Sequence, residues 1–329
     1  MSPILTVRDL QVSFRTDDGV VRAVDGVSFE VSPGEVVAIV GESGSGKSVT
    51  AQTLIGLTRA PNSKITGSVT FDGRDLVTLS DDEFRGVRGE HIAMVFQDPM
   101  TSLNPVYRVG DQIAEMIRAH RDVSKAEALT QAVDLLRSVG IPNPERRVCD
   151  YPHEFSGGMR QRVMIAMALA LDPEVLIADE PTTALDVTIQ AQILRLLEKL
   201  NAERNLSVVL ITHDLGVVAE LADRVVVMYG GQIVEDGPLH EIFYNPQHPY
   251  TWGLLGSIAR LDEARPERLP QIPGQPPSLL NPPTGCRFAA RCTYAFEACT
   301  QPPTLEVRGG GPGHLDRCWL PAEEKVASR

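Results

Sequence analysis

The stretch Gly41-Glu42-Ser43-Gly44-Ser45-Gly46-Lys47-Ser48 decides the fold of this 329-residue chain. It fits the pattern G-x-x-x-x-G-K-[ST] at every fixed position. A short apolar run, residues 35–40, precedes it, and a helix is predicted from Lys47 to about Leu57. In such a strand–loop–helix unit, loop N–H groups and the helix N-terminus attract phosphate oxygens. The stretch therefore predicts a phosphate-binding loop, whereas a turn that matches the pattern by chance would lack this context.

The fixed residues of the loop predict what it binds. Lys47 is placed to reach the β- and γ-phosphates of a nucleotide, and Ser48 to ligate Mg²⁺. Gly41 and Gly46 permit backbone conformations that other residues resist, so loop N–H groups can point at phosphate oxygens. We therefore expect a nucleoside triphosphate and Mg²⁺ as ligands.

An acidic pair follows a later apolar run of the sequence. Residues 175–178 read as a buried strand, and Asp179 and Glu180 follow directly. In an enzyme with a phosphate loop, the first carboxylate would hold the Mg²⁺ shell, and the second could polarise the attacking water. Two solvated acids at an ordinary strand end are the alternative. The complete phosphate loop favours the catalytic interpretation.

Two further polar residues follow predicted central strands. Gln97 comes after the run 92–96 and is a candidate for the metal or the water, and His213 follows the run 207–212. A lone histidine is more often structural. Ligands of open α/β sheets, however, bind at the carboxyl ends of the strands. We therefore expect His213 to sense the γ-phosphate.

A second glycine motif opens another predicted helix. In Phe155-Ser156-Gly157-Gly158-Met159-Arg160-Gln161-Arg162, Ser156 fits a helix N-cap and the two glycines expose backbone N–H groups. The motif is either a plain helix cap or a second anion-binding site. Because the chain already has one phosphate loop, a head-to-tail dimer is a physical solution, in which each motif caps the nucleotide of the other chain.

Composition excludes several classes of protein. The net charge is −12, which disfavours non-specific binding to nucleic acid or to an anionic membrane surface. No apolar run approaches the ~20 residues that span a bilayer. The N-terminus carries no pattern of an export signal, so we expect a cytosolic, reducing environment in which the five cysteines are not paired.

Strands that alternate with helices predict an α/β fold. We expect an N-terminal β region, a helical insert at about residues 98–165, and one nucleotide-binding domain over residues 1–235. Fourteen of the 24 prolines lie from Pro238 onward, which marks residues 236–329 as a separate C-terminal segment. Residues 266–283 within it should be extended and poor in regular structure.

The ordered motif set resembles that of the ATPase subunit of an ATP-binding cassette (ABC) transporter over about residues 4–235. In the order of that family, the phosphate-loop, Q-loop, signature, Walker B, D-loop and switch-histidine motifs match residues 41–48, Gln97, Ser156–Gln161, Val175–Glu180, Ala184–Asp186 and His213. The resemblance implies a P-loop NTPase fold with a RecA-like core sheet, an antiparallel β subdomain, a helical insert subdomain and a small Pro/Cys-rich extension.

The resemblance also implies roles for individual residues. It assigns catalysis to Glu180, His213 and Gln97, and the Mg²⁺ shell to Ser48, Gln97 and Asp179. It implies that Ser156, Gly157, Gly158 and Gln161 contact the ATP that the second chain binds, and it places Asp186 in the D-loop. ATP in this chain would be held by Phe14, Gly41, Glu42, Ser43, Gly44, Ser45, Gly46, Lys47, Ser48 and Val49. Phe14 stands where tyrosine is usual, and either ring can stack on adenine.

Two segments are similar to the oligopeptide/dipeptide import branch of the family, residues 97–105 and His248-Pro249-Tyr250-Thr251. This resemblance implies an ATPase that powers peptide import from the cytoplasmic face of the cell membrane. Its expected partners are a related second ATPase chain, two membrane-spanning permease subunits and an extracytoplasmic substrate-binding protein. The alternatives are a soluble ABC ATPase of DNA repair or translation, or an importer of another cargo such as nickel.

Four of the five cysteines lie close together in the sequence of the C-terminal segment. Their spacing is C-x5-C-x6-C-x18-C, from Cys286 through Cys292 and Cys299 to Cys318. Four thiolates in a compact, reduced segment suit a metal, and the absence of C-x2-C pairs argues against zinc. The resemblance favours a [4Fe–4S] cluster, zinc is the second candidate, and four incidental cysteines are the alternative. Cys149 stands alone and is interpreted as structural.

Overall fold

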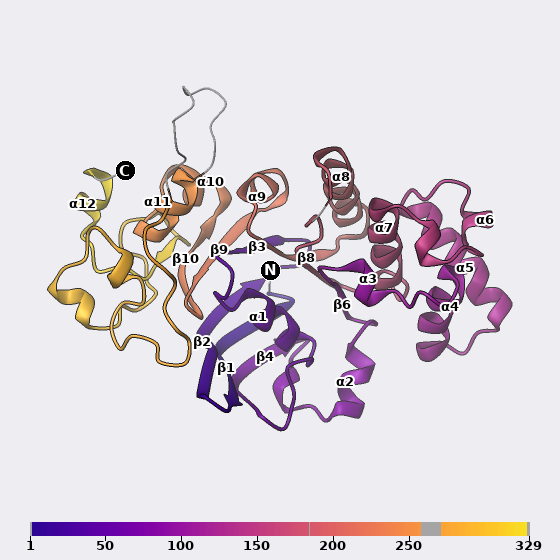
Figure 1. The fold of residues 1–329 in the computed structure, drawn as a ribbon, viewed down its shortest axis with the longest axis horizontal. Helices are drawn as coiled ribbons and strands as arrows, with labels where there is room; N and C mark the ends of the chain where they lie inside the picture. Colours follow the sequence, from indigo (N-terminus) through magenta and orange to yellow (C-terminus); the bar gives the residue numbers. More distant parts are fainter. Residues whose placement is uncertain (1, 184, 258–270, 328–329) are drawn as a thin grey trace. The chain divides into compact units, whose positions relative to one another are not determined.

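The computed structural model describes residues 2–183, 185–257 and 271–327 (Figure 1). Ala184 of the predicted D-loop and residues 266–270 of the proline-rich segment lie outside the described residues. The chain divides into two compact units. Unit 1 comprises Met1–Ser2, Ser32–Glu35 and Thr78–Ile211, and unit 2 comprises Pro3–Val31, Val36–Val77 and Thr212–Arg329.

Unit 2 begins with a four-stranded antiparallel sheet in the order β2-β1-β4-β5. Its strands are β1 (Leu5–Thr16), β2 (Gly19–Val31), β4 (Ser63–Phe71) and β5 (Arg74–Asp75). The pairing of Thr16 with Gly19 places the turn of the first hairpin at residues 17–18. Leu5, Val7, Leu10 and Val12 of β1 are buried, as expected for a strand with one face on a core.

A second sheet in unit 2 supports the phosphate loop. Its order is β11-β10-β9-β3, from β3 (Val36–Val40), β9 (Arg224–Tyr229), β10 (Gln232–Pro238) and β11 (Leu315–Asp316). β3 and β9 are parallel, whereas β10 is antiparallel to β9 and to β11. Every residue of β3 is buried, which agrees with the apolar run that predicts a central strand.

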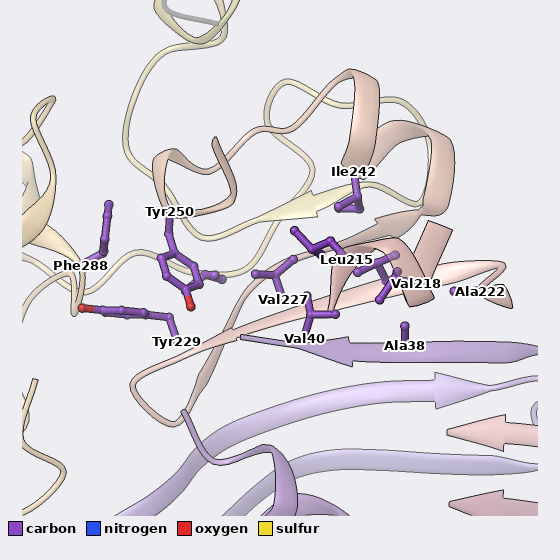
Figure 2. Packing of buried hydrophobic residues seen from close by; sticks show 12 residues of the cluster. Ala38, Val40, Leu215, Val218, Ala222, Val227, Tyr229, Ile242, Tyr250 and Phe288 are labelled. Atoms are coloured by element: carbon purple, nitrogen blue, oxygen red, sulfur yellow. The ribbon is translucent and has the colours of Figure 1, made fainter. Parts of the chain in front are cut away.

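Helices of unit 2 pack around a core that includes residues from the C-terminal segment. They are α1 (Lys47–Leu54), α9 (Leu215–Leu221), α10 (Leu239–Tyr244), α11 (Pro249–Gly256) and α12 (Ala322–Ala327), with 3-10 turns η1 (Leu76–Thr78), η3 (Ala289–Arg291) and η4 (Glu297–Thr300). Figure 2 shows Tyr229, Tyr250 and Phe288 gathered at one end of this core, beside the aliphatic residues. The rings of Tyr229 and Tyr250 lie 4.6 Å apart, and those of Tyr229 and Phe288 lie 5.2 Å apart.

Unit 1 holds three parallel strands in the order β8-β7-β6. They are β6 (Ile92–Val95), β7 (Val175–Asp179) and β8 (Ser207–Thr212), and all their residues are buried. Its helices are α2 (Asp81–Val87), α3 (Pro99–Ser102), α4 (Val109–His120), α5 (Lys125–Ser138), α6 (Pro144–Arg147), α7 (Gly157–Ala168) and α8 (Val187–Arg204), with η2 at Pro152–Glu154. α4 and α5 pack on each other and on α7. No helix among the described residues is long and apolar enough to cross a bilayer.

The first helix is shorter than the sequence predicts. α1 ends at Leu54 rather than near Leu57. Gly56 takes a left-handed conformation with φ of +69°, and the N–H of Leu57 donates to the carbonyl oxygen of Gln52 over 2.9 Å. This is a glycine-dependent helix end, which periodicity of apolar residues does not reveal.

Candidate functional site

The phosphate loop of unit 2 joins β3 to α1 and depends on two glycines. Gly41 has φ of +151°, and a Cβ there would lie 2.1 Å from the carbonyl oxygen of Met228. Gly46 has φ of +100°, and a Cβ there would lie 2.5 Å from the carbonyl oxygen of Ala23. A side chain at either position would therefore displace the loop from the strands that hold it.

Polar groups of this loop fit a bound anion. The Lys47 ammonium donates to the carbonyl oxygens of Gly41 over 2.7 Å and of Glu42 over 3.0 Å, so it lies folded across the loop. α1 starts without a side-chain cap. Ser45 Oγ is buried and has no hydrogen-bond partner within the described part of the chain. A phosphate group would supply acceptors for N–H groups at a helix N-terminus and for a buried hydroxyl.

Other residues assigned to the nucleotide lie on neighbouring elements of unit 2. Ser48 and Val49 are half-buried in the first turn of α1. Phe14 is half-buried on β1, opposite Val21 of β2 and Ser63 of β4. His213 follows β8 and is exposed. Ser43 and Gly44 are also exposed, so the outer part of the loop is open to solvent.

Unit 1 brings two of the predicted catalytic residues into contact. Gln97 Nε2 donates to Glu180 Oε2 over 3.0 Å, and the Thr183 hydroxyl donates to the same oxygen over 2.8 Å. Glu180 has φ of +48°, and its N–H donates to the carbonyl oxygen of Ile211 over 2.8 Å. Asp179 is buried at the end of β7. Thr183 was not predicted as a site residue, although its position three residues after Glu180 is a short-range signal.

The second glycine motif forms the start of α7 in unit 1. Ser156 is the N-cap, and its Oγ accepts from the N–H of Met159 over 3.4 Å. A Cβ on Gly158 would lie 2.4 Å from Ile189 Cγ2, so this glycine lets α7 approach α8 closely. Gln161 is buried. Asp186 is the N-cap of α8 and accepts from the N–H of Ile189 over 3.0 Å.

The four cysteines of the C-terminal segment do not form the predicted cluster site. The N–H of Cys286 donates to the carbonyl oxygen of Cys299 over 2.9 Å, so these two lie close along the backbone. Burial raises the pKa of the Cys292 and Cys318 thiols to about 11, which favours the neutral thiol over the thiolate that a metal needs. No group of three or more His, Cys, Asp or Glu residues in the described ranges could hold a metal ion. The structure therefore does not support the [4Fe–4S] cluster or the zinc alternative.

Comparison with known families and structures agrees with the resemblance. A family model described as ABC transporter matches residues 24–183, and one described as oligopeptide/dipeptide transporter, C-terminal region, matches residues 234–299. Among solved structures, the dimeric ATP-binding cassette MJ0796 in a post-hydrolysis state with ADP and Pi is similar, with a TM-score of 0.64 and 29% identity. The similarity covers 71% of this chain and 98% of that one. These matches show an α/β P-loop fold with an antiparallel β subdomain.

Similar curated proteins extend over nearly the whole chain. The oligopeptide transport ATP-binding protein OppD of Bacillus subtilis is 55% identical over 96% of this chain and 88% of its own length. OppD of Salmonella typhimurium is 53% identical over 98% of this chain and 95% of its own length. The dipeptide transport ATP-binding protein DppD of Bacillus subtilis is 54% identical over 97% of this chain and 95% of its own length. The chain therefore belongs to the ABC transporter ATPase family, within its oligopeptide/dipeptide transporter branch.

Proposed function

We propose that this chain is the ATP-hydrolysing subunit of an ABC transporter that imports oligopeptides or dipeptides. The observation that carries the proposal is the phosphate loop of residues 41–48. Lys47 lies folded across this loop, and the buried Ser45 hydroxyl inside it has no hydrogen-bond partner among the described residues. Relatives similar to this chain over almost their full length are named as oligopeptide and dipeptide transport ATP-binding proteins. The loop supports nucleotide binding, and the names of the relatives support peptides as the transported cargo.

ATP and Mg²⁺ are the ligands of this proposal. Loop N–H groups and Lys47 would hold the phosphates, Phe14 would stack on adenine, and Ser48, Gln97 and Asp179 would hold Mg²⁺. Bound Mg²⁺ would neutralise charge that develops on the phosphate oxygens. Residues 1–235 would form the nucleotide-binding domain, with the insert at about 98–165, and residues 236–329 a separate extension.

Hydrolysis needs a base that is held in place. Glu180 would polarise the attacking water, because its carboxylate is oriented by hydrogen bonds from Gln97 and Thr183. His213 would sense the γ-phosphate. Ser156, Gly157, Gly158 and Gln161 would complete the nucleotide site of a second, related ATPase chain, with Asp186 in the D-loop beside it.

The assembly of this proposal has further subunits. Family membership implies permease subunits that cross the membrane and a substrate-binding protein that delivers the peptide. This chain would bind the permeases peripherally at the cytoplasmic face. The net charge of −12 disfavours non-specific binding to nucleic acid, and with it the DNA-repair and translation alternative.

Uptake measurements test the proposal. A strain that lacks this chain is complemented with the wild-type gene, with Lys47→Ala or with Glu180→Gln, and uptake of labelled dipeptides, hexapeptides and Ni²⁺ is measured. We expect the wild-type gene alone to restore peptide uptake. Restored Ni²⁺ uptake without peptide uptake would show that the cargo is Ni²⁺ rather than a peptide. Restored peptide uptake with Lys47→Ala would contradict the proposed dependence of transport on ATP binding by this chain.

A further inference from the structure

Glu42, the first variable residue of the phosphate loop, has a hydrogen-bond partner at its N–H, its carbonyl oxygen and its carboxylate. The N–H of Glu42 donates to the Tyr250 hydroxyl over 2.8 Å. Its carbonyl oxygen accepts from the Lys47 ammonium over 3.0 Å. Its carboxylate accepts two hydrogen bonds from the Arg291 guanidinium, over 2.7 Å and 3.0 Å. Two of these three partners lie more than 200 positions away in the sequence, in the C-terminal segment.

Arg291 is itself held in one orientation. Its side chain is 5% exposed at the end of η3, the 3-10 turn between Cys286 and Cys292. Its Nε donates to the carbonyl oxygen of Pro273 over 2.8 Å, and Nη2 also donates to that of Ile272 over 3.2 Å. Nη1 also donates to the Tyr229 hydroxyl over 3.2 Å. A guanidinium with this many fixed donors presents a rigid fork to the Glu42 carboxylate.

Tyr250 is equally constrained. It is fully buried at the start of α11, and its ring packs against Tyr229 and Phe288 (Figure 2). Its hydroxyl therefore meets the Glu42 N–H from a fixed position. A glycine-rich loop loses much conformational entropy when it binds a ligand, and partners that fix it beforehand reduce that cost.

Electrostatics gives Arg291 a second effect on the loop. The Glu42 carboxylate stands in the sequence only five residues before Lys47, on a loop that must receive a polyanion. An unpaired carboxylate there would repel phosphate, whereas a paired one is largely neutralised at short range.

We propose that Arg291 and Tyr250 are positioning residues of the phosphate loop, through which the C-terminal segment sets the affinity of this chain for ATP. The inference rests on the proposed role of residues 41–48 in ATP binding. It adds a regulatory function to the segment after residue 236: any event that moves η3 or α11 changes nucleotide affinity at the loop.

Nucleotide affinity of the purified full chain tests this inference. The dissociation constant of the fluorescent analogue mant-ATP is measured with Mg²⁺ at a temperature well below the unfolding midpoint of every variant. We expect Arg291→Gln to weaken binding about tenfold, since a hydrogen-bonded charge pair is lost beside the phosphates. Tyr250→Phe removes one hydroxyl only and should weaken binding about threefold to tenfold.

Two further variants separate positioning from general stability. Arg317→Gln is the matched control, because Arg317 also donates to carbonyl oxygens, of Ile233 and Pro303, but does not contact the loop. It should lower the unfolding midpoint and leave the dissociation constant unchanged. Adding Glu42→Gln to Arg291→Gln removes the unpaired carboxylate and should recover most of the lost affinity. A purely structural Arg291 predicts no such recovery.

Each outcome bears on a different claim. If Lys47→Ala leaves mant-ATP binding unchanged, the proposed function of the loop is wrong. If Lys47→Ala abolishes binding while Arg291→Gln and Tyr250→Phe bind like the wild type, only the positioning inference is overturned. Should Arg291→Gln fail to fold, Tyr250→Phe alone decides, because wild-type affinity in that variant contradicts the inference.

Discussion

Glu180 combines two properties that an ordinary strand end does not need. Its φ of +48° is a left-handed conformation that costs free energy in a residue with a long side chain. Its carboxylate is oriented by Gln97 and Thr183. Strained backbone that is held by its surroundings is concentrated at functional sites. Both features agree with a group that must meet a water molecule in one geometry.

We expect Glu180→Gln to lower ATP turnover of the assembled complex at least about 100-fold, because the amide cannot accept a proton from water. The dissociation constant for ATP should stay near that of the wild type. Glu174→Gln is the matched control, an exposed carboxylate just before β7 that pairs with His91. Turnover by Glu180→Gln at the wild-type rate would remove Glu180 from the mechanism.

Residues of the site differ in how far the sequence could predict them. Lys47, Ser48 and Glu180 follow strands whose apolar runs are continuous, so a local pattern locates them at the carboxyl ends of those strands. Arg291 could not be found this way. Its partner Glu42 lies 249 positions away, and only the folded C-terminal segment brings the two together.

Among the elements, α11 shows how the C-terminal segment depends on a neutral histidine. His248 is the N-cap of α11, and its Nδ1 accepts from the N–H of Tyr250 over 3.1 Å. Burial, together with the nearby charges of Lys325 and Arg317, lowers the pKa of His248 to about 3. The sequence predicted His248 only as part of a family-like segment, because burial of a histidine has no local signature.

This pKa predicts a loss of stability in acid. The unfolded chain takes up a proton at His248 near pH 6.5, whereas the folded chain does not until about pH 3. The contribution of neutral His248 to the free energy of unfolding is therefore complete above pH 6.5. It is lost as the pH falls below 6.5, by about 1.4 kcal/mol per pH unit. We expect the thermal unfolding midpoint of the wild type to decrease as the pH is lowered from 6.5 to 5.

The matched variant is His248→Asn, since asparagine can cap the helix but does not titrate. The difference between the midpoints of wild type and variant should change by about 2–4 °C per pH unit, in favour of the variant as the pH falls. Parallel pH profiles for the two proteins would show that the pKa of His248 does not change on folding, which would contradict the prediction.

In the described part of the chain, two helices begin directly after a glycine motif: α1 in unit 2, which has no side-chain cap, and α7 in unit 1, which Ser156 caps. One nucleotide bound at α1 is served by the phosphate loop of its own chain. The second terminus therefore has a physical use if it caps a nucleotide held by another chain.

Gly157→Asp tests that arrangement at the level of the assembled molecule. A Cβ on Gly157 would meet only Leu185 Cδ2 at 3.7 Å, so the substitution fits, and a carboxylate in the first turn of α7 should stabilise the helix. The same charge would repel the phosphates of a nucleotide on the facing chain. We therefore expect an unchanged or higher unfolding midpoint and unchanged ATP affinity of the isolated chain. Turnover of the complex purified from native membranes should fall about tenfold or more.

Gly157→Ala is the control, because it adds the Cβ without the charge and should keep most of the turnover. Separate measurements on the isolated chain and on the complex are what make the result informative. A defect confined to the complex assigns the α7 terminus to the nucleotide of the other chain. A loss of ATP affinity in the isolated Gly157→Asp chain would instead place that terminus at its own nucleotide. Full turnover of the Gly157→Asp complex would leave Ser156 as a plain helix cap.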